Sequence, residues 1–104
     1  MSAGSSVERV SEALKRAHAT QDTVNAFISI DDERALQRAA QIDRRIEAGE
    51  DVGPLAGVPV ALKDLIDHEG RVTTNGSSFY AEVAESTAPC VSRLERAGAV
   101  IIGR

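Results

Sequence analysis

Apolar side chains recur every three or four positions near the start of the chain, which predicts a helix over about residues 7–18. Ser5 and Glu8 stand at the spacing of a capping box where this helix begins. The apolar stripe consists of Val7, Val10, Leu14 and Ala17. Residues 20–22 are polar and predict a break. Residues 25–30 are partly β-branched, which favours a strand or an extended segment.

A second helical stretch follows, and either Asp31 or Asp32 can cap its start. Gly49 is its natural end, because glycine accepts the left-handed conformation past a helix terminus. The predicted apolar stripe consists of Leu36, Ala39, Ile42 and Ile46. The basic side chains of this stretch are expected on the helix surface; they are Arg34, Arg38, Arg44 and Arg45.

Strict alternation of apolar and other residues marks positions 58–63, after a loop over 50–56 that Pro54 stiffens. The period of two predicts a strand whose aliphatic face lies opposite Lys63. The aliphatic residues are Val58, Val60 and Leu62, and the alternating ones are Pro59, Ala61 and Lys63. Further along, the sequence TTNGSS at 73–78 predicts a turn.

A third helix is expected to begin at Ser86 or Thr87, with Pro89 in its first turn, and to end at Gly98. Its stripe consists of Val91, Leu94 and Ala97. Residues 99–102 are wholly apolar, which is typical of a strand buried on both faces. The alternation of helices and strands predicts an α/β fold with a partly parallel sheet.

Composition and charge narrow the function classes. Hydrophobic residues make up 42% of the chain and charged residues 27%, as in ordinary globular proteins. The net charge of −4 and the interleaved acids and bases argue against direct binding of nucleic acid. A single cysteine, Cys90, excludes an internal disulfide and favours a cytoplasmic location. No signal peptide and no stretch near the ~20 apolar residues of a membrane span is present.

Lys63 is the first candidate for chemistry. Its neighbours on the same strand face, Pro59 and Ala61, are rigid or small, so a confined pocket there would favour the neutral amine, which can act as a base. Periodicity alone favours the alternative, a lysine that faces solvent on an edge strand.

Other candidates are weaker. Ser77 and Ser78 follow a glycine, but such pairs in turns mostly satisfy local backbone groups. Residues 67–69, Asp-His-Glu, converge poorly on one ion, so we expect a solvated loop, with neither metal nor cofactor. Cys90 could act as a nucleophile beside a histidine, although a lone cysteine on a helix face is more commonly a small buried hydrophobe. Gly53 and Gly57 do not form a phosphate loop, because no Gly-Lys-Ser/Thr follows.

The stretches GPLAGVPVALKDLID, TTNGSS and STAPCVSRLERAGAVIIGR, together with the upstream NAFISI, resemble the N-terminal part of the amidase signature family. The resemblance runs from about Ser5 to Arg104, and its most specific element is the pattern Leu-x-Gly-x-Pro-x-x-x-Lys-Asp ending at Lys63 and Asp64. It implies an α/β/α fold around a large mixed sheet, of which residues 1–50 would be a helical N-terminal segment and 51–104 the start of the catalytic core.

The resemblance also implies a catalytic triad of a nucleophilic serine, a serine held by a cis peptide bond, and a lysine, which by its match to the motif is Lys63. The glycine- and serine-rich motif that supplies both serines lies further downstream in this family and is absent here. The buried strand at 99–102 is followed only by Gly103 and Arg104, so the sequence looks like an N-terminal fragment. Alone, it is expected to be inactive.

The favoured interpretation is therefore a fragment of an amidase that hydrolyses a carboxamide, a small-molecule substrate, and whose partner is its missing C-terminal part or a complementing chain. One alternative is the ammonia-releasing subunit of the tRNA-dependent amidotransferase. That branch usually carries asparagine after Lys-Asp, whereas this chain has Leu65. The other alternative is a non-catalytic module that binds a partner.

Overall fold

The computed structural model describes residues 5–63, 66, 68–70, 72–73, 82–83 and 86–104. Within them the chain forms α1 (Ser6–Val24), α2 (Asp32–Glu47), β1 (Pro59–Ala61), β2 (Val72–Thr73), β3 (Glu82–Val83), α3 (Pro89–Arg96) and β4 (Val100–Gly103). The presence of both helices and strands confirms the predicted α/β class. The order of the three helices and of β1 and β4 along the chain also matches the prediction.

Strands β1 and β4 pair in parallel, as the sequence predicted. Pro59 lies opposite Val100 and Val60 opposite Ile101, and the register then shifts so that Ala61 faces Gly103. Strands β2 and β3 form a separate antiparallel pair that the sequence did not predict. Of the predicted turn at 73–78, Thr73 lies in β2 and the other positions fall outside the described residues.

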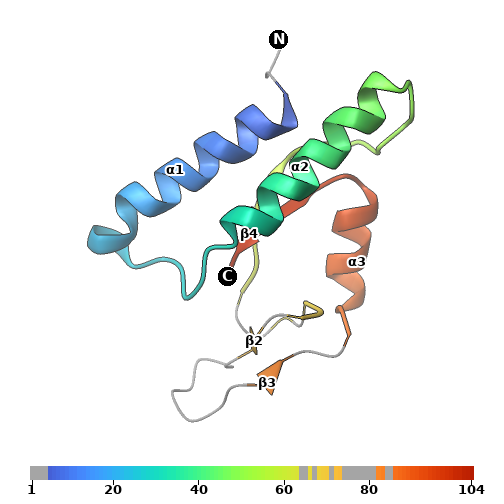
Figure 1. Cartoon of the computed structure of the whole chain (residues 1–104). Helices are drawn as coiled ribbons and strands as arrows, with labels where there is room; N and C mark the ends of the chain where they lie inside the picture. The colour runs from blue at the N-terminus through green and yellow to red at the C-terminus, as the bar shows by residue number, and fades with distance from the viewer. Residues whose placement is uncertain (1–4, 64–65, 67, 71, 74–81, 84–85) are drawn as a thin grey trace.

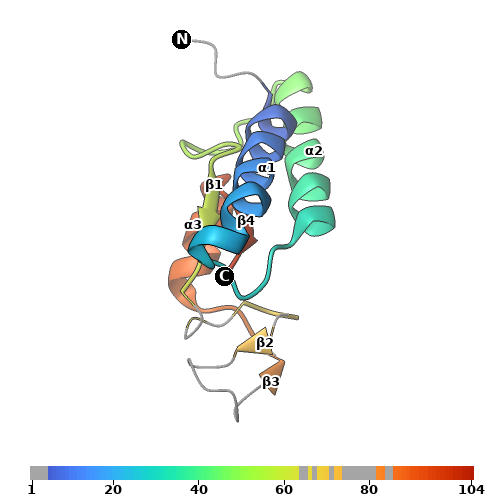
Figure 2. The same ribbon diagram turned by 90° about the vertical axis from the view of Figure 1, so that its left-hand side faces the viewer.

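Helices cover the β1–β4 pair on both faces (Figures 1 and 2). The α1 and α2 helices lie side by side on one face, and α3 lies on the other. The larger core cluster joins α1 and α2 to the first face; its buried members are Val10, Leu14, Ala35, Ala39, Ile42, Val52, Val100 and Ile102. The smaller one consists of Leu62, Val91 and Ile101. Because successive residues of β4 point to opposite faces, all four are buried, which confirms the prediction for this apolar run.

The backbone N–H groups at the start of α1 all find acceptors. The Ser5 hydroxyl accepts from the N–H of Glu8 at 3.1 Å, as the capping-box spacing predicted. The N–H groups of Ser6 and Val7 donate to the two carboxylate oxygens of Asp43, at 2.8 and 3.0 Å. The carboxylate belongs to α2, so one side chain both caps α1 and joins the two helices.

The predicted break at residues 20–22 was wrong, and for residues 25–30 the strand alternative was wrong. The helix continues through the polar residues at 20–22 and ends at Asn25, which has a positive φ of 51°. Continuation is possible because Thr20 donates its hydroxyl to the carbonyl of Arg16 within the helix, at 2.9 Å. Residues 25–30 form no named strand; Ile30 makes a single antiparallel bridge to Gly103. This segment thus lies along the second edge of β4, where the N–H of Asp31 donates to the carbonyl of Ile102 at 2.8 Å.

The helix ends largely follow the predictions. Gly49 and Gly98 adopt positive φ just past α2 and α3, as expected for helix stops. Asp31 is the N-cap residue of α2, but its side chain makes no capping hydrogen bond. In α3 the N-cap is Ala88, not Ser86 or Thr87, because Pro89 itself begins the helix. Ile46, assigned to the apolar stripe of α2, is exposed.

Candidate functional site

The carboxyl ends of β1 and β4 lie at the same edge of the parallel pair, and Lys63 lies at this edge. The N–H of Leu62 donates to the carbonyl of Gly103 at 3.0 Å, so the chain stays beside β4 up to that residue. Lys63 follows immediately and is exposed. In α/β proteins with parallel sheets, functional groups gather just beyond the carboxyl ends of the strands. The position of Lys63 therefore suits a role in chemistry.

The alternation predicted for this strand is present only at its end, because Val58, Pro59 and Val60 are all partly buried. Leu62 is buried against Val91 of α3 and Ile101 of β4, whereas Ala61 and Lys63 are exposed. In the described part of the chain Lys63 therefore faces solvent, as periodicity alone favoured, and does not lie in a confined pocket. A catalytic role for Lys63 stays a prediction.

Arg104 holds the backbone just beyond Lys63. The N–H of Ile66 donates to the carbonyl of Lys63 at 3.0 Å. The guanidinium of Arg104 donates through Nη2 to the carbonyl of Ile66. Arg104 is only 6% exposed, although it follows a strand end. Nothing in the local sequence pattern distinguished this arginine, since the contact joins residues from two different elements.

The expectation of a solvated loop at residues 67–69 was wrong for His68, which is 2% exposed. Its Nε2 atom lies 3.1 Å from Nη2 of Arg34 on α2 and 3.4 Å from Oε1 of Glu95 on α3. Burial and the positive charge of Arg34 lower the pKa of His68 below its usual value, against the opposing effect of Glu95. Glu69 is exposed, and Asp67 falls outside the described residues.

Two of the four arginines assigned to the surface of α2 instead reach across to other elements. Arg34 donates to the carbonyl of Glu69 at 3.2 Å, and Arg38 donates to the carbonyl of Glu95 at 2.7 Å. Both side chains are half-buried. Arg44 and Arg45 are exposed, as predicted. The half of α2 that contains Arg34 and Arg38 is thus joined to α3 and to the segment after Lys63.

The remaining candidates contribute no site. Cys90 is a free, exposed thiol, so the expectation of a buried residue was wrong; Val91, the next residue, takes the buried position. Ser77 and Ser78 fall outside the described residues. Among the residues that the structure does describe, no three His, Cys, Asp or Glu side chains gather closely enough to hold a metal ion.

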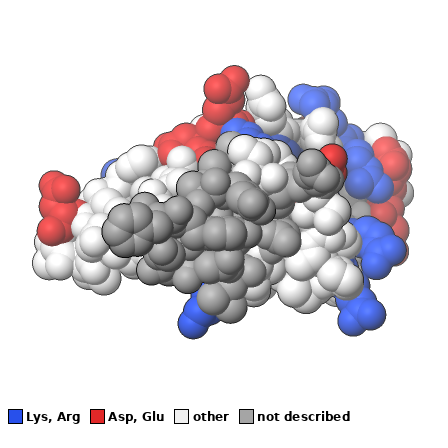
Figure 3. Space-filling view, turned by 90° about the horizontal axis from the view of Figure 1, so that it is seen from below, with Lys and Arg blue, Asp and Glu red and all other residues white. Residues whose placement is uncertain are grey.

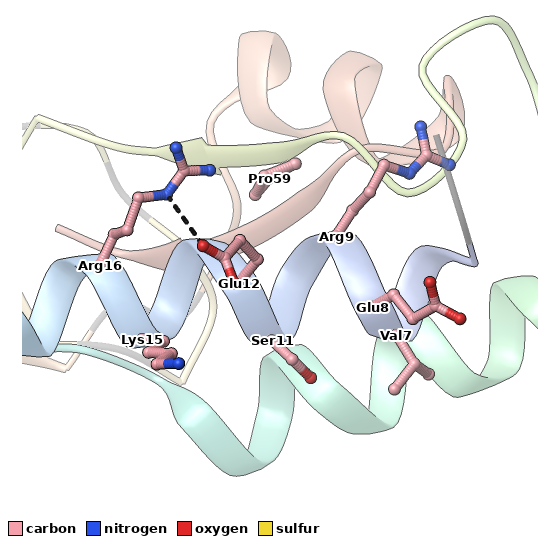
Figure 4. Close-up of a pocket in the computed structure, with 8 residues that line it drawn as sticks. All are labelled: Val7, Glu8, Arg9, Ser11, Glu12, Lys15, Arg16 and Pro59. Atoms are coloured by element: carbon pink, nitrogen blue, oxygen red, sulfur yellow. Dashed lines mark ion pairs between the residues drawn. The ribbon is translucent and has the colours of Figure 1, made fainter. Parts of the chain in front are cut away.

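A groove of about 740 Å³ runs along the outer face of α1, from Val7 to Arg16, and is bounded by Pro59 of β1 (Figure 4). Side chains of both signs line it, and Glu12 and Arg16 lie 3.9 Å apart within it. Lys63 is not among the residues that line this groove, so the groove and the lysine are separate features.

Acidic and basic side chains both appear among the described residues on the face seen from below in Figure 3. None of the described helices is both long and apolar enough to span a membrane.

Comparison with known proteins adds an independent line of argument. A family model described as Amidase matches residues 8–104. A glutamyl-tRNA(Gln) amidotransferase subunit from Agathobacter rectalis is 45% identical over 98 residues, which cover 93% of this chain and 20% of the relative. The chain thus spans about a fifth of the length of that curated relative.

Solved structures give the same picture. Native peptide amidase from Stenotrophomonas maltophilia matches with a TM-score of 0.89 and 34% identity, over 97% of this chain and 21% of that chain. A second match has a TM-score of 0.91 and 41% identity, over 96% of this chain and 22% of that chain. It comes from a vestigial protein complex that is described as revealing the evolutionary origins of an s-triazine catabolic enzyme. The family match over nearly the whole length, supported by these relatives, shows that the chain belongs to the amidase family.

Proposed function

We propose that this chain forms part of an enzyme that hydrolyses the C–N bond of a carboxamide, with Lys63 as its catalytic base. The observation that carries the proposal is the position of Lys63, exposed directly beyond the carboxyl end of a strand that pairs in parallel with β4. Membership of the amidase family supports the reaction class. The small-molecule amide itself is not specified by the described residues.

In the mechanism that the family resemblance implies, the neutral amine of Lys63 accepts a proton from a bridging serine. That serine in turn accepts the proton of the nucleophilic serine, whose oxygen attacks the amide carbonyl. The tetrahedral intermediate collapses when the C–N bond breaks and the nitrogen leaves with a proton. Water then hydrolyses the acyl-enzyme and restores the serine. This is the logic of a serine triad with lysine in place of histidine and aspartate.

We assign neither serine to this chain, so the 104-residue polypeptide alone should not turn over amides. The partner that the proposal requires is a polypeptide segment with the glycine- and serine-rich motif, either continuous with this chain or supplied by a second one. A cytoplasmic location, and the absence of direct binding to nucleic acid, remain predictions of the sequence.

A second candidate is the ammonia-releasing component of a tRNA-dependent amidotransferase, which the 45% identity to the relative from Agathobacter rectalis favours. In that case the ammonia released from an amide would be transferred and not lost to solvent. Leu65, at a position where that branch usually carries asparagine, favours the general amidase. Glutamine as the preferred amide substrate would support the amidotransferase instead.

A chimera with the peptide amidase of Stenotrophomonas maltophilia tests the role of Lys63. Residues 5–104 would replace the matching segment of that enzyme, which supplies the rest of the chain. Lys63→Ala should lower kcat/KM for amide hydrolysis at least ~10³-fold, because loss of a triad member removes most of the rate. Lys15→Ala, which removes an exposed lysine of α1, is the matched control and should leave the rate nearly unchanged.

Equal rates for the Lys63→Ala and Lys15→Ala chimeras would contradict the assignment of the base. Amide hydrolysis by the purified 104-residue chain without any partner would contradict a different part of the proposal, the placement of the nucleophile outside this chain.

A further inference from the structure

The segment that follows Lys63 is fastened to three elements. Arg104 at the end of β4 donates to the carbonyl of Ile66. Arg34 of α2 donates to the carbonyl of Glu69 at 3.2 Å, and the N–H of Glu69 donates to the hydroxyl of Thr87, before α3, at 3.0 Å. His68 is the buried side chain among these attachments, and it lies between α2 and α3.

One nitrogen of His68 faces two partners with opposite requirements. The guanidinium of Arg34 can only donate, so at 3.1 Å it requires Nε2 to be an acceptor, which is the neutral ring protonated on Nδ1. The carboxylate of Glu95, at 3.4 Å from the same atom, can accept only from a ring that carries a proton on Nε2. Protonation of the ring therefore removes the acceptor for Arg34 and leaves only the contact with Glu95.

The charges around His68 decide which state dominates. The described groups that act on it are Arg34 of α2, Glu95 of α3 and Asp31, the N-cap residue of α2. Arg38 does not face the ring but donates to the backbone carbonyl of Glu95 and so fixes that residue. Burial and Arg34 favour the neutral ring, which lowers the pKa of His68. The neutral ring is the form that can accept a hydrogen bond from Arg34.

We propose that His68 is a positioning residue for Lys63: with its Nε2 between Arg34 and Glu95, it determines whether Arg34 holds the backbone carbonyl of Glu69, which follows the lysine in the chain. In the neutral form His68 keeps Arg34 in place to bind the carbonyl of Glu69. In the protonated form His68 pairs with Glu95 and repels Arg34, so the hydrogen bond from Arg34 to the carbonyl of Glu69 is released. The role as a positioning residue rests on the proposed function of Lys63, whereas the coupling between the two residues does not.

The sequence offers a clean probe of this coupling, because its only lysines are Lys15 and Lys63. Reductive methylation of the 104-residue chain with ¹³C-formaldehyde gives one NMR signal for each lysine and another for the α-amine. Both lysine signals would be followed from pH 4.5 to 8, together with the ring protons of His18 and His68. The Lys63 signal should shift with the same midpoint as the His68 ring.

Lys15 is the internal control. It belongs to α1, which contributes none of the groups that act on His68, so its signal should show no inflection at the His68 midpoint. His68→Gln places an amide near Nε2 that can accept from Arg34 at every pH. In this variant the Lys63 inflection should be lost while the Lys15 signal stays as in the parent chain.

Glu95→Gln is the second variant, for the case in which His68→Gln does not fold. It removes the carboxylate that favours the protonated ring, so the midpoints of His68 and Lys63 should move together to lower pH. The proposal is overturned if Lys63 shows no inflection while His68 titrates, if the inflection persists in His68→Gln, or if the two midpoints separate in Glu95→Gln. None of these readouts uses amide hydrolysis, so a failure here is distinct from a failure of the catalytic assignment.

Discussion

Asp43→Asn should lower the free energy of unfolding by about 1–2 kcal/mol, because one carboxylate serves two backbone donors of α1. The N–H groups of Ser6 and Val7 lie 2.8 and 3.0 Å from its two oxygens. An asparagine offers one oxygen, so its amide group must face the other N–H donor. Asparagine and aspartate have similar helix propensities, so the change leaves α2 itself almost unaffected.

The magnitude follows from two contributions. Loss of a capping side chain typically costs about 0.5–2 kcal/mol, and loss of a negative charge at a helix N-terminus costs about 0.3–1 kcal/mol. Because Asp43 is half-buried, water can replace part of the lost hydrogen bonding. The two contributions therefore add to a loss of about 1–2 kcal/mol in the free energy of unfolding. With a urea m-value near the lower end of the usual range of about 1–3 kcal/mol/M, the unfolding midpoint should fall by roughly 1–2 M.

The assay is urea unfolding of the 104-residue chain, followed by circular dichroism at several pH values. Desolvation raises the pKa of Asp43, but the hydrogen bonds from Val7 and Ser6 and the charge of Arg9 outweigh it, so the pKa is lowered. A carboxyl group with a lowered pKa stabilises the fold above its unfolded value of about 3.9, and this contribution is lost as pH falls through the folded value. The difference between parent and variant should therefore be constant near pH 7 and shrink below about pH 4.

Glu47→Gln is the matched control, because it makes the same kind of change on the same helix at an exposed residue. It should change stability by less than about 0.5 kcal/mol. Equal effects of the two substitutions at pH 7, or a difference for Asp43→Asn that does not shrink in acid, would refute the assignment of Asp43 as the cap of α1.

Three further predictions concern stability and exposure. Gly98→Ala should destabilise the chain by about 2 kcal/mol or more, because a Cβ there would lie 2.6 Å from the carbonyl oxygen of Val52. Gly49 also has a positive φ, but a Cβ there would have nothing within 4 Å, so Gly49→Ala should cost less. Equal urea midpoints for the two variants would contradict this prediction. Ile42→Val should cost about 0.5–1.5 kcal/mol in urea unfolding because Ile42 is 0% exposed, and no change would show that the core there is loose. Cys90 should react with a thiol reagent equally fast in the folded and urea-unfolded chain, whereas strong protection would place it in the interior.

Local patterns predicted the parts of the fold that local physics determines. The apolar run of β4 and most of the α2 stripe follow from the burial of both faces or of one, and both are present, although Ile46 of the stripe is exposed. The alternation before Lys63 is present only from Ala61 onward. The extent of α1 was underestimated, because a polar segment was taken as a break although its side chains bond within the helix. Ile30 was assigned to a possible strand, yet it makes only one bridge to β4.

The surroundings of the candidate site were less accessible to prediction. Lys63 was found through its motif and its place in the alternation. His68 is buried because Arg34 and Glu95, distant from it in sequence and on different helices, converge on one ring nitrogen. A histidine between an acidic residue and a glutamate has the pattern of a solvent-exposed loop, and no periodicity indicates otherwise. Such contacts depend on how α2 and α3 pack.

The central place of β4 has a consequence for how the molecule assembles during synthesis. Translation delivers α1 and α2 first, and their apolar faces have no sheet to cover until the residues from Val100 onward are made. The β1–β4 pair likewise joins segments separated by a long stretch of chain, so closing it costs entropy before any contact compensates. The two helices can therefore pack against each other early in synthesis, whereas the core between them and the sheet closes only once β4 has been made.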